Sequence, residues 1–110
     1  MKEMLRFFVN ETWGFVCDDA WGKQDAQVVC NQLGITGDAE ATLSGFFGNG
    51  VGTIHLDEVG CGGSEENLLE CSHGGIGSHD CFNFEAAGVI CTRKLCSQLR
   101  HLLHFTWRTF

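Results

Sequence analysis

The sequence predicts a small α+β domain stabilised by disulfides, and three observations support this fold class. The chain has 110 residues, enough for one domain, and seven cysteines, a share typical of secreted domains with small cores. One segment has the periodicity of a helix, and several short segments have the patterns of strands. Glycine is abundant, at fifteen residues, and the glycines between these segments predict long loops. The hydrophobic content of 44% excludes a disordered chain.

Two short strands are predicted near the N-terminus, at Phe7–Val9 and Trp13–Cys17, and a polar turn joins them. The turn residues Asn10-Glu11-Thr12 form an N-glycosylation sequon, so Asn10 is a candidate glycan site in a chain that enters the secretory route. The large apolar rings of Trp13 and Trp21 are expected to lie in the core.

The clearest helix is predicted directly after this region. Its apolar residues recur at i, i+3, i+4 and i+7, and they are Ala26, Val29, Cys30 and Leu33. Gly34 follows at the position where a glycine ends a helix in a left-handed conformation. The pattern therefore predicts that Cys30 lies on the buried face of the helix.

The second half of the chain is predicted to be mostly loop. Residues 35–53 are rich in small and polar residues and predict a long loop, whereas Thr53–Asp57 alternates as a strand does. Ser64 is expected to cap a short helix that contains Leu68 and Leu69. A glycine-rich loop follows, and a final buried strand is predicted at Ala87–Cys91.

The charge changes sharply near residue 92. Residues 1–92 contain all fourteen acidic residues and only three cations, a balance of −11, whereas residues 93–110 contain four cations and no acid, a balance of +4. We expect 93–110 to be a basic, aromatic tail outside the domain. The acidic body excludes a general nucleic-acid binder, and no apolar run is long enough to span a membrane.

The cysteines divide at the same boundary. Cys96 lies in the tail and is expected to be a free thiol, and the body keeps six, namely Cys17, Cys30, Cys61, Cys71, Cys81 and Cys91. Six cysteines predict three disulfides in any of fifteen pairings. The alternative is a metal-stabilised intracellular domain, in which Cys71, His73, His79 and Cys81 bind zinc, although their spacing matches no common finger and four other cysteines would stay unexplained.

Seven segments in order resemble the scavenger receptor cysteine-rich (SRCR) family, over about 85 residues. Trp13–Trp21 is similar to the family's WGTVCDDxW opening, and Asp25–Gly34 resembles its DAxVVCRQLG helix. The match continues through Phe47-Gly48-x-Gly50, the segment from Ile54 to Glu65, Leu68-x-x-Cys71, His79-x-Cys81 and Glu85–Cys91. Ile35 stands where the eight-cysteine members have a further cysteine, so the chain resembles the six-cysteine group A pattern.

The resemblance implies a curved antiparallel sheet that cradles one main helix, with long loops. It also implies the disulfides Cys17–Cys81, Cys30–Cys91 and Cys61–Cys71. The domain itself is expected at residues 7–92, because residues 1–6 are an atypical N-terminus that replaces the family's usual first strand. The edge of the sheet would then be unpaired or covered by another segment.

Acidic residues near the predicted strand ends are the candidate metal ligands. If Cys17 pairs with Cys81, then Asp18, Asp19 and Glu85 approach one another, and oxygen ligands of this kind suit Ca²⁺ or Mg²⁺. Similar clusters in the family bind calcium, and the resemblance implies a second site formed by Asp57, Glu58 and Asn83. The alternative is that these acids are simply solvated. No organic cofactor is expected.

The resemblance implies a non-enzymatic, extracellular module that binds proteins or polyanionic, including microbial, ligands with the help of Ca²⁺. Such modules occur in tandem with other domains of secreted or membrane proteins, and the alternative is an accessory domain of a secreted protease or amine oxidase. No nucleophile lies in a recognisable catalytic motif. Residues 1–9 lack the apolar run of a signal peptide, so we expect a fragment or a mispredicted start.

Overall fold

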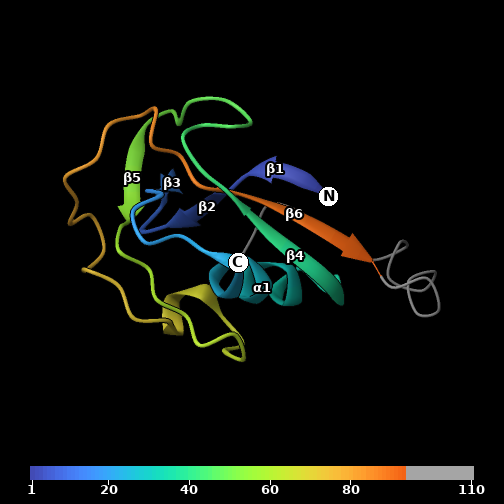
Figure 1. The fold of residues 1–110 in the computed structure, drawn as a ribbon. Helices are drawn as coiled ribbons and strands as arrows, with labels where there is room; N and C mark the ends of the chain where they lie inside the picture. The colour runs from blue at the N-terminus through green and yellow to red at the C-terminus, as the bar shows by residue number, and fades with distance from the viewer. Residues whose placement is uncertain (94–110) are drawn as a thin grey trace.

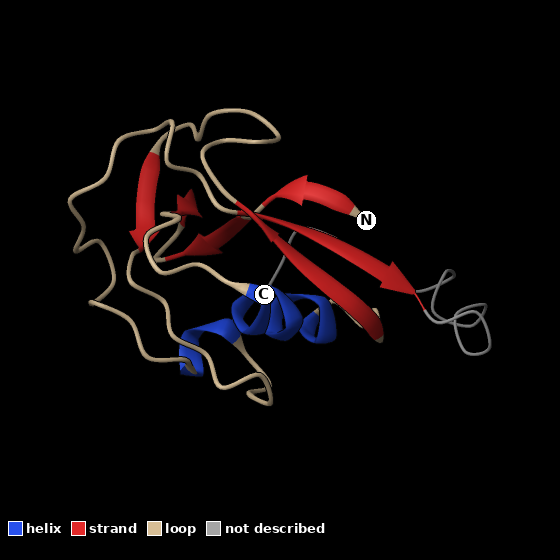
Figure 2. Cartoon of the chain, viewed as in Figure 1, coloured by secondary structure: helices blue, strands red, loops and turns tan. Residues whose placement is uncertain are grey.

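The computed structural model describes residues 1–93. Residues 94–110, with the predicted free thiol Cys96, lie outside the described residues. The secondary structure of the described part consists of β1 (Lys2–Met4), β2 (Arg6–Val9), β3 (Thr12–Val16), α1 (Lys23–Gln32), β4 (Gly37–Thr42), β5 (Thr53–Leu56), the 3₁₀ helix η1 (Leu68–Glu70) and β6 (Gly88–Arg93). Loops connect β4 to β5 and β5 to β6 over most of their length (Figure 2).

The strands form two small sheets, and α1 packs against one of them (Figure 1). The first sheet has the order β1-β6-β4, and both of its strand pairs are antiparallel. The second has the order β2-β3-β5, in which β2 and β3 are antiparallel and β3 and β5 are parallel. The predicted fold class, a small disulfide-rich α+β domain with one main helix, is confirmed.

The expectation for residues 1–6 needs correction, because this segment supplies strands itself. Lys2 pairs with Ile90 and Met4 with Gly88, so β1 itself occupies the edge of the first sheet that was expected to be unpaired or covered by another segment. The N-terminal ammonium of Met1 donates a hydrogen bond to the Cys91 carbonyl at 2.8 Å. The residues of β1 have low β-propensity, but hydrogen bonding to β6 outweighs that preference.

The expectation of a continuous loop over residues 35–53 is also wrong in part. β4 pairs with β6 along six residues, from Gly37 opposite Arg93 to Thr42 opposite Gly88. Its sequence, GDAEAT, has few strand formers, but its small side chains allow α1 to approach closely, and Ala39 is fully buried. A strand can therefore form through its partner strand and helix although its residues have low strand propensity.

Hydrogen bonds define both ends of α1. At its start the carboxylate of Asp25 accepts hydrogen bonds from the backbone N–H groups of Gly22 at 2.8 Å and Cys61 at 2.7 Å, which fixes the loop of Cys61 to the helix. At its end Gly34 has a φ of +81°, and the Ile35 N–H donates to the Cys30 carbonyl at 2.9 Å. This is the glycine-terminated helix end that the sequence predicts.

The short helix η1 begins differently from the prediction. Its cap is Asn67, whose side-chain oxygen accepts from the Leu69 N–H at 2.9 Å, and not Ser64. The carboxylate of Glu65 accepts instead from the backbone N–H groups of Gly62 at 2.8 Å and Gly63 at 2.9 Å. These hydrogen bonds hold the pKa of Glu65 below its usual value, and the bond from Gly62 has the largest effect.

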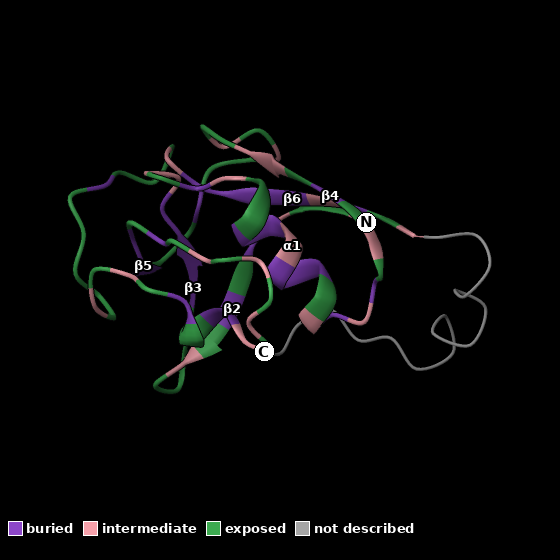
Figure 3. Ribbon diagram, turned by 60° about the horizontal axis from the view of Figure 1, so that its bottom comes forward, coloured by how far each residue is buried: buried purple, intermediate pink, exposed green. Residues whose placement is uncertain are grey.

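The core consists of two clusters of buried side chains, visible as the purple segments of α1, β3 and β6 in Figure 3. The larger lies between α1 and the sheets and includes Trp21, whose indole N–H donates to the Gly88 carbonyl at 3.0 Å. The smaller contains Phe15, Cys17, Ile54, Cys81 and Ala86. Trp13 was expected in the core and is instead 38% exposed, because it lies next to the turn of the β2–β3 hairpin.

Three disulfides join these elements: Cys17–Cys81, Cys30–Cys91 and Cys61–Cys71. They are the pairs that the family resemblance implies. Cys30–Cys91 fastens α1 to β6 inside the larger cluster. Because Cys71 and Cys81 are both bonded to other cysteines, neither is a free thiolate, and the zinc alternative with His73 and His79 is wrong.

The disulfides should differ in their contribution to stability. Cys30–Cys91 joins residues 61 positions apart and Cys61–Cys71 joins residues 10 apart. Constraint of the unfolded chain gives about 4 kcal/mol for the first and about 3 kcal/mol for the second. Urea unfolding under non-reducing conditions should therefore show a larger loss of unfolding free energy for Cys30→Ala with Cys91→Ala than for Cys61→Ala with Cys71→Ala. A larger loss in the second variant would contradict this.

Candidate cation and ligand site

The chain around Cys17 pairs with the chain around Ala86 immediately after β3. Cys17 and Ala86 form an isolated antiparallel bridge, and the Asp18 N–H donates to the Glu85 carbonyl at 2.9 Å. On the other side of this bridge the Ala87 N–H donates to the Val16 carbonyl at 2.8 Å. Two segments that are far apart in the sequence are thereby aligned, and Asp18 and Asp19 lie beside Glu85.

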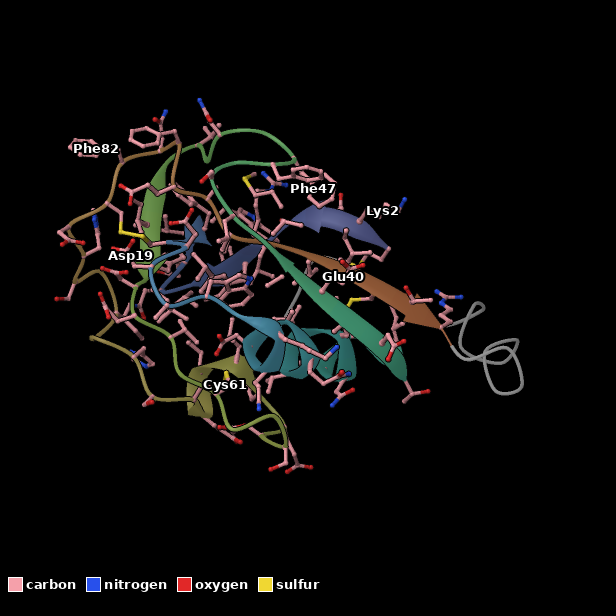
Figure 4. All side chains as sticks on the ribbon, viewed as in Figure 1. Lys2, Asp19, Glu40, Phe47, Cys61 and Phe82 are labelled. Carbon is pink, nitrogen blue, oxygen red and sulfur yellow. A yellow bond between two sulfur atoms is a disulfide. The ribbon has the colours of Figure 1, made fainter. Side chains whose placement is uncertain are left out.

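The carboxylates of Asp18, Asp19 and Glu85 converge. One oxygen of each lies within 4.8 Å of one oxygen of each of the others, which brings the first predicted site together. All three side chains are partly exposed to solvent. Figure 4 shows Asp19 next to a disulfide, and Cys81 Sγ is 3.7 Å from Asp19 Oδ2. That sulfur is bonded to Cys17 and has no proton to donate, so its contact with Asp19 is not a hydrogen bond.

Backbone hydrogen bonds orient two of the three carboxylates. Asp18 Oδ2 accepts from the Ser44 N–H at 2.6 Å, and Glu85 Oε1 accepts from the Phe82 N–H at 2.9 Å. Each carboxylate is therefore held in place by a different loop. A site whose ligands are fixed before the ion arrives loses less conformational entropy when it binds.

The carboxylate of Asp19 is repelled by the negative charges of its neighbours, which changes its pKa. Partial burial raises its pKa first, and the negative charges of Asp57, Glu85 and Asp80 raise it further, to about 6. At neutral pH Asp19 is thus ionised against an opposing field. A bound divalent cation would reverse the sign of that field, which is the situation expected of a cation ligand.

The residues of the second predicted site, Asp57, Glu58 and Asn83, have different surroundings. Asp57 is 4% exposed, and one of its oxygens lies within 4.8 Å of one Asp19 oxygen, so it joins the first cluster. Glu58 is exposed and contributes its backbone N–H to Asp57 Oδ1 at 2.7 Å. Asn83 is exposed, and its backbone carbonyl accepts from the Gly50 N–H at 2.7 Å.

Asp80 is a member of the acidic surface that the sequence analysis did not identify. It precedes Cys81, and its charge and side-chain hydrogen bond both contribute to the raised pKa of Asp19. The pairing of Cys17 with Cys81 could have indicated it, because each cysteine has an aspartate as its direct neighbour.

Exposed aromatic side chains lie on the two loops that hold the carboxylates. Phe46 is 69% exposed on the loop that contains Ser44, and Phe82 and Phe84 are 65% and 53% exposed on the loop of Glu85. The rings of Phe82 and Phe84 are stacked, with centroids 5.7 Å apart. We call these three phenylalanines with Asp18, Asp19, Asp57, Asp80 and Glu85 the acidic–aromatic surface; Phe82 is at its outer side in Figure 4.

No helix among residues 1–93 is long and apolar enough to cross a membrane.

Comparisons with known proteins place the chain in a family. The model of the scavenger receptor cysteine-rich domain matches residues 4–92. A "Scavenger receptor cysteine-rich domain superfamily protein" from Patiria pectinifera is 44% identical over 91 residues, which are 83% of this chain and 8% of that protein. The chain therefore corresponds to a small part of that relative.

Two solved structures share the fold. The dimeric form of the SRCR domain of mouse MARCO has a TM-score of 0.78 and 39% sequence identity, covering 84% of this chain and 87% of that one. The third SRCR domain of murine neurotrypsin has a TM-score of 0.77 and 46% identity, covering 82% and 84%. With the sequence motifs, the disulfides and the fold in agreement, the chain belongs to the scavenger receptor cysteine-rich domain family.

Proposed function

We propose that this domain binds extracellular proteins or polyanionic ligands through the acidic–aromatic surface, with Ca²⁺ as part of the binding site. Domains of this family are extracellular and generally act as non-catalytic binding modules. The observation that supports the proposal most directly is the convergence of Asp18, Asp19 and Glu85, whose oxygens lie within 4.8 Å of one another.

The donor set suits calcium. Two oxygens that bind the same Ca²⁺ at 2.3–2.6 Å are at most about 5 Å apart, which the three carboxylates satisfy. All the available donors are hard oxygen atoms, because the nearby sulfurs of Cys17 and Cys81 form a disulfide. Mg²⁺ prefers a stricter octahedral arrangement with several water molecules, so it fits a fixed cluster of protein carboxylates less well.

A divalent cation also resolves a conflict of charge. Residues 1–92 have a formal balance of −11, which repels sulfated or phosphorylated ligands. When bound, Ca²⁺ supplies positive charge and further coordination positions for ligand oxygens. The phenylalanines beside the cluster supply apolar contact area for a protein ligand. One such surface is small, so repeated modules would strengthen binding through avidity.

The alternative role, as an accessory domain of a secreted protease or amine oxidase, uses the same binding surface. It differs only in which domain is attached to the module.

Calorimetric titration with Ca²⁺ tests the cation site directly. We expect saturable binding to the unaltered protein at pH 7.5 and its loss in Asp19→Ala, because Asp19 is common to both groups of converging carboxylates. Asp38→Ala is the matched control, since Asp38 is an exposed aspartate on β4, outside these groups, and should leave the binding isotherm unchanged. Equal heats in all three proteins, or none in any, would reject the site.

The raised pKa of Asp19 predicts a pH-dependent stability. Without Ca²⁺, the unfolded chain loses the Asp19 proton near pH 3.8 and the folded protein at about 6, so stability falls as the pH rises between these values. Asp19→Asn removes this decrease. Thermal unfolding in EDTA should show a higher Tm for Asp19→Asn than for the unaltered protein at pH 7.5, and a similar Tm at pH 3.5. Asp38→Asn should follow the unaltered protein, and a parallel curve for Asp19→Asn would contradict the assignment.

Polyanion recognition can be tested with dextran sulfate as the probe. The biotinylated domain, displayed as a tetramer on streptavidin, should bind immobilised dextran sulfate in Ca²⁺ and dissociate in EDTA, because the acidic surface repels the probe without the cation. Asp19→Ala should fail to bind in both conditions. Binding that persists in EDTA, or in Asp19→Ala, would show that the cation cluster is not the recognition site.

A further inference from the structure

An exposed aromatic pair lies on the β2–β3 hairpin, outside the acidic–aromatic surface. Phe8 and Trp13 are directly opposite each other on the two strands and are 44% and 38% exposed. Their ring centroids are 5.3 Å apart, and the Arg6 guanidinium lies 5.7 Å from the Trp13 ring centroid. Two large rings and a cation packed together in solvent form a preassembled, partly apolar platform.

The N-glycosylation sequon forms the turn of this same hairpin. Val9 pairs with Thr12, so only Asn10 and Glu11 lie between the strands, with φ values of +51° and +62°. A two-residue turn with both φ values positive matches the twist of a hairpin and favours asparagine at its first position. Asn10 is exposed, and its side-chain amide forms no hydrogen bond to any residue of the described range 1–93. Within residues 1–93, the attachment atom is therefore free of hydrogen bonds.

The platform is within reach of a sugar attached to that atom. Asn10 is two residues from Phe8 along the chain, a distance of about 6.6 Å in a strand, and Trp13 lies directly across from Phe8. The pyranose ring of N-acetylglucosamine has polar edges and an apolar face of C–H groups. That face can cover an aromatic ring and remove apolar surface from water while its hydroxyls remain solvated.

We propose that Asn10 carries an N-linked glycan whose first N-acetylglucosamine packs against Phe8 and Trp13. The Arg6 side chain, stacked on Trp13, borders the platform and offers hydrogen-bond donors to the sugar's oxygens. The glycan then covers the aromatic pair and reinforces the hairpin whose second strand leads to Cys17 and Asp18. The modification requires only passage through the secretory route, and it is independent of calcium binding.

The modification itself is tested by mass spectrometry of the protein secreted from mammalian cells by means of a fused signal peptide. The peptide that contains Asn10 should carry a glycan that peptide-N-glycosidase F removes, with conversion of Asn10→Asp. Thr12→Ala should abolish the glycan, because the sequon needs the hydroxyl residue, whereas Thr36→Ala, outside any sequon, should not. An unmodified Asn10 in the secreted protein would overturn the proposal.

The packing is tested by a thermodynamic cycle. The glycan trimmed to its first N-acetylglucosamine should raise Tm, on the order of 4 °C, relative to the fully deglycosylated protein. In Trp13→Ser this difference should disappear, and in Phe8→Ser it should shrink. Leu43→Ser is the control, since Leu43 is 48% exposed on another loop and should leave the difference unchanged. The same Tm difference in Trp13→Ser and in the unaltered protein would refute the contact.

An NMR measurement separates packing from general effects on stability. The N-acetyl methyl and ring protons of the first sugar should shift upfield in the folded glycoprotein, because they lie over the indole and phenyl rings. Trp13→Ser should return them to the positions found in a short glycopeptide. Sugar resonances that already coincide with those of the glycopeptide in the unaltered protein would show that the glycan extends into solvent without touching the platform.

Discussion

The pairing of Cys17 with the segment around Ala86 is the constraint on which the acidic surface depends. A backbone bridge, two flanking hydrogen bonds and the Cys17–Cys81 disulfide hold two chain segments together that are 64 residues apart at the disulfide. The carboxylates of Asp18, Asp19 and Glu85 lie on these segments and repel one another. Without a covalent and hydrogen-bonded connection, that repulsion would separate them. The fold thus imposes the geometry of the site and holds the carboxylates together despite their mutual repulsion.

This arrangement explains why so small a domain needs three disulfides. The core contains one helix and two three-stranded sheets, and much of the chain is loop. Long-range disulfides lower the entropy of the unfolded chain and so compensate for a limited core. They also offset the electrostatic cost of the acidic cluster, since a functional site generally reduces the stability of the protein that contains it. Cys30–Cys91 lies in the larger core cluster, whereas Cys17–Cys81 lies in the smaller one, beside the acidic site.

The exposed aromatic residues divide into two groups with different surroundings. Phe46, Phe82 and Phe84 lie on loops whose backbone N–H groups donate hydrogen bonds to carboxylates of the acidic cluster. An apolar rim beside a charged centre suits recognition of another molecule. Phe8 and Trp13 lie on a hairpin whose turn contains a sequon, beside a cation and not beside the acidic cluster. A surface that a glycan covers is removed from protein contacts. The proposed glycan therefore covers the hairpin face and leaves the acidic–aromatic surface accessible to ligands.

The sequence by itself determined the helix, its glycine-terminated end, the strands at β5 and β6, the family and, through the family, the cysteine pairs. These features depend on local periodicity or on ordered motifs, which a sequence displays directly. Only the tertiary structure decided that Lys2–Met4 and Gly37–Thr42 are strands, because both pair with β6 and have little strand propensity of their own. It also decided that Asp57 joins Asp19 and that Trp13 is exposed. Distances between carboxylates and the burial of a ring depend on which distant segments meet, and no local pattern records that.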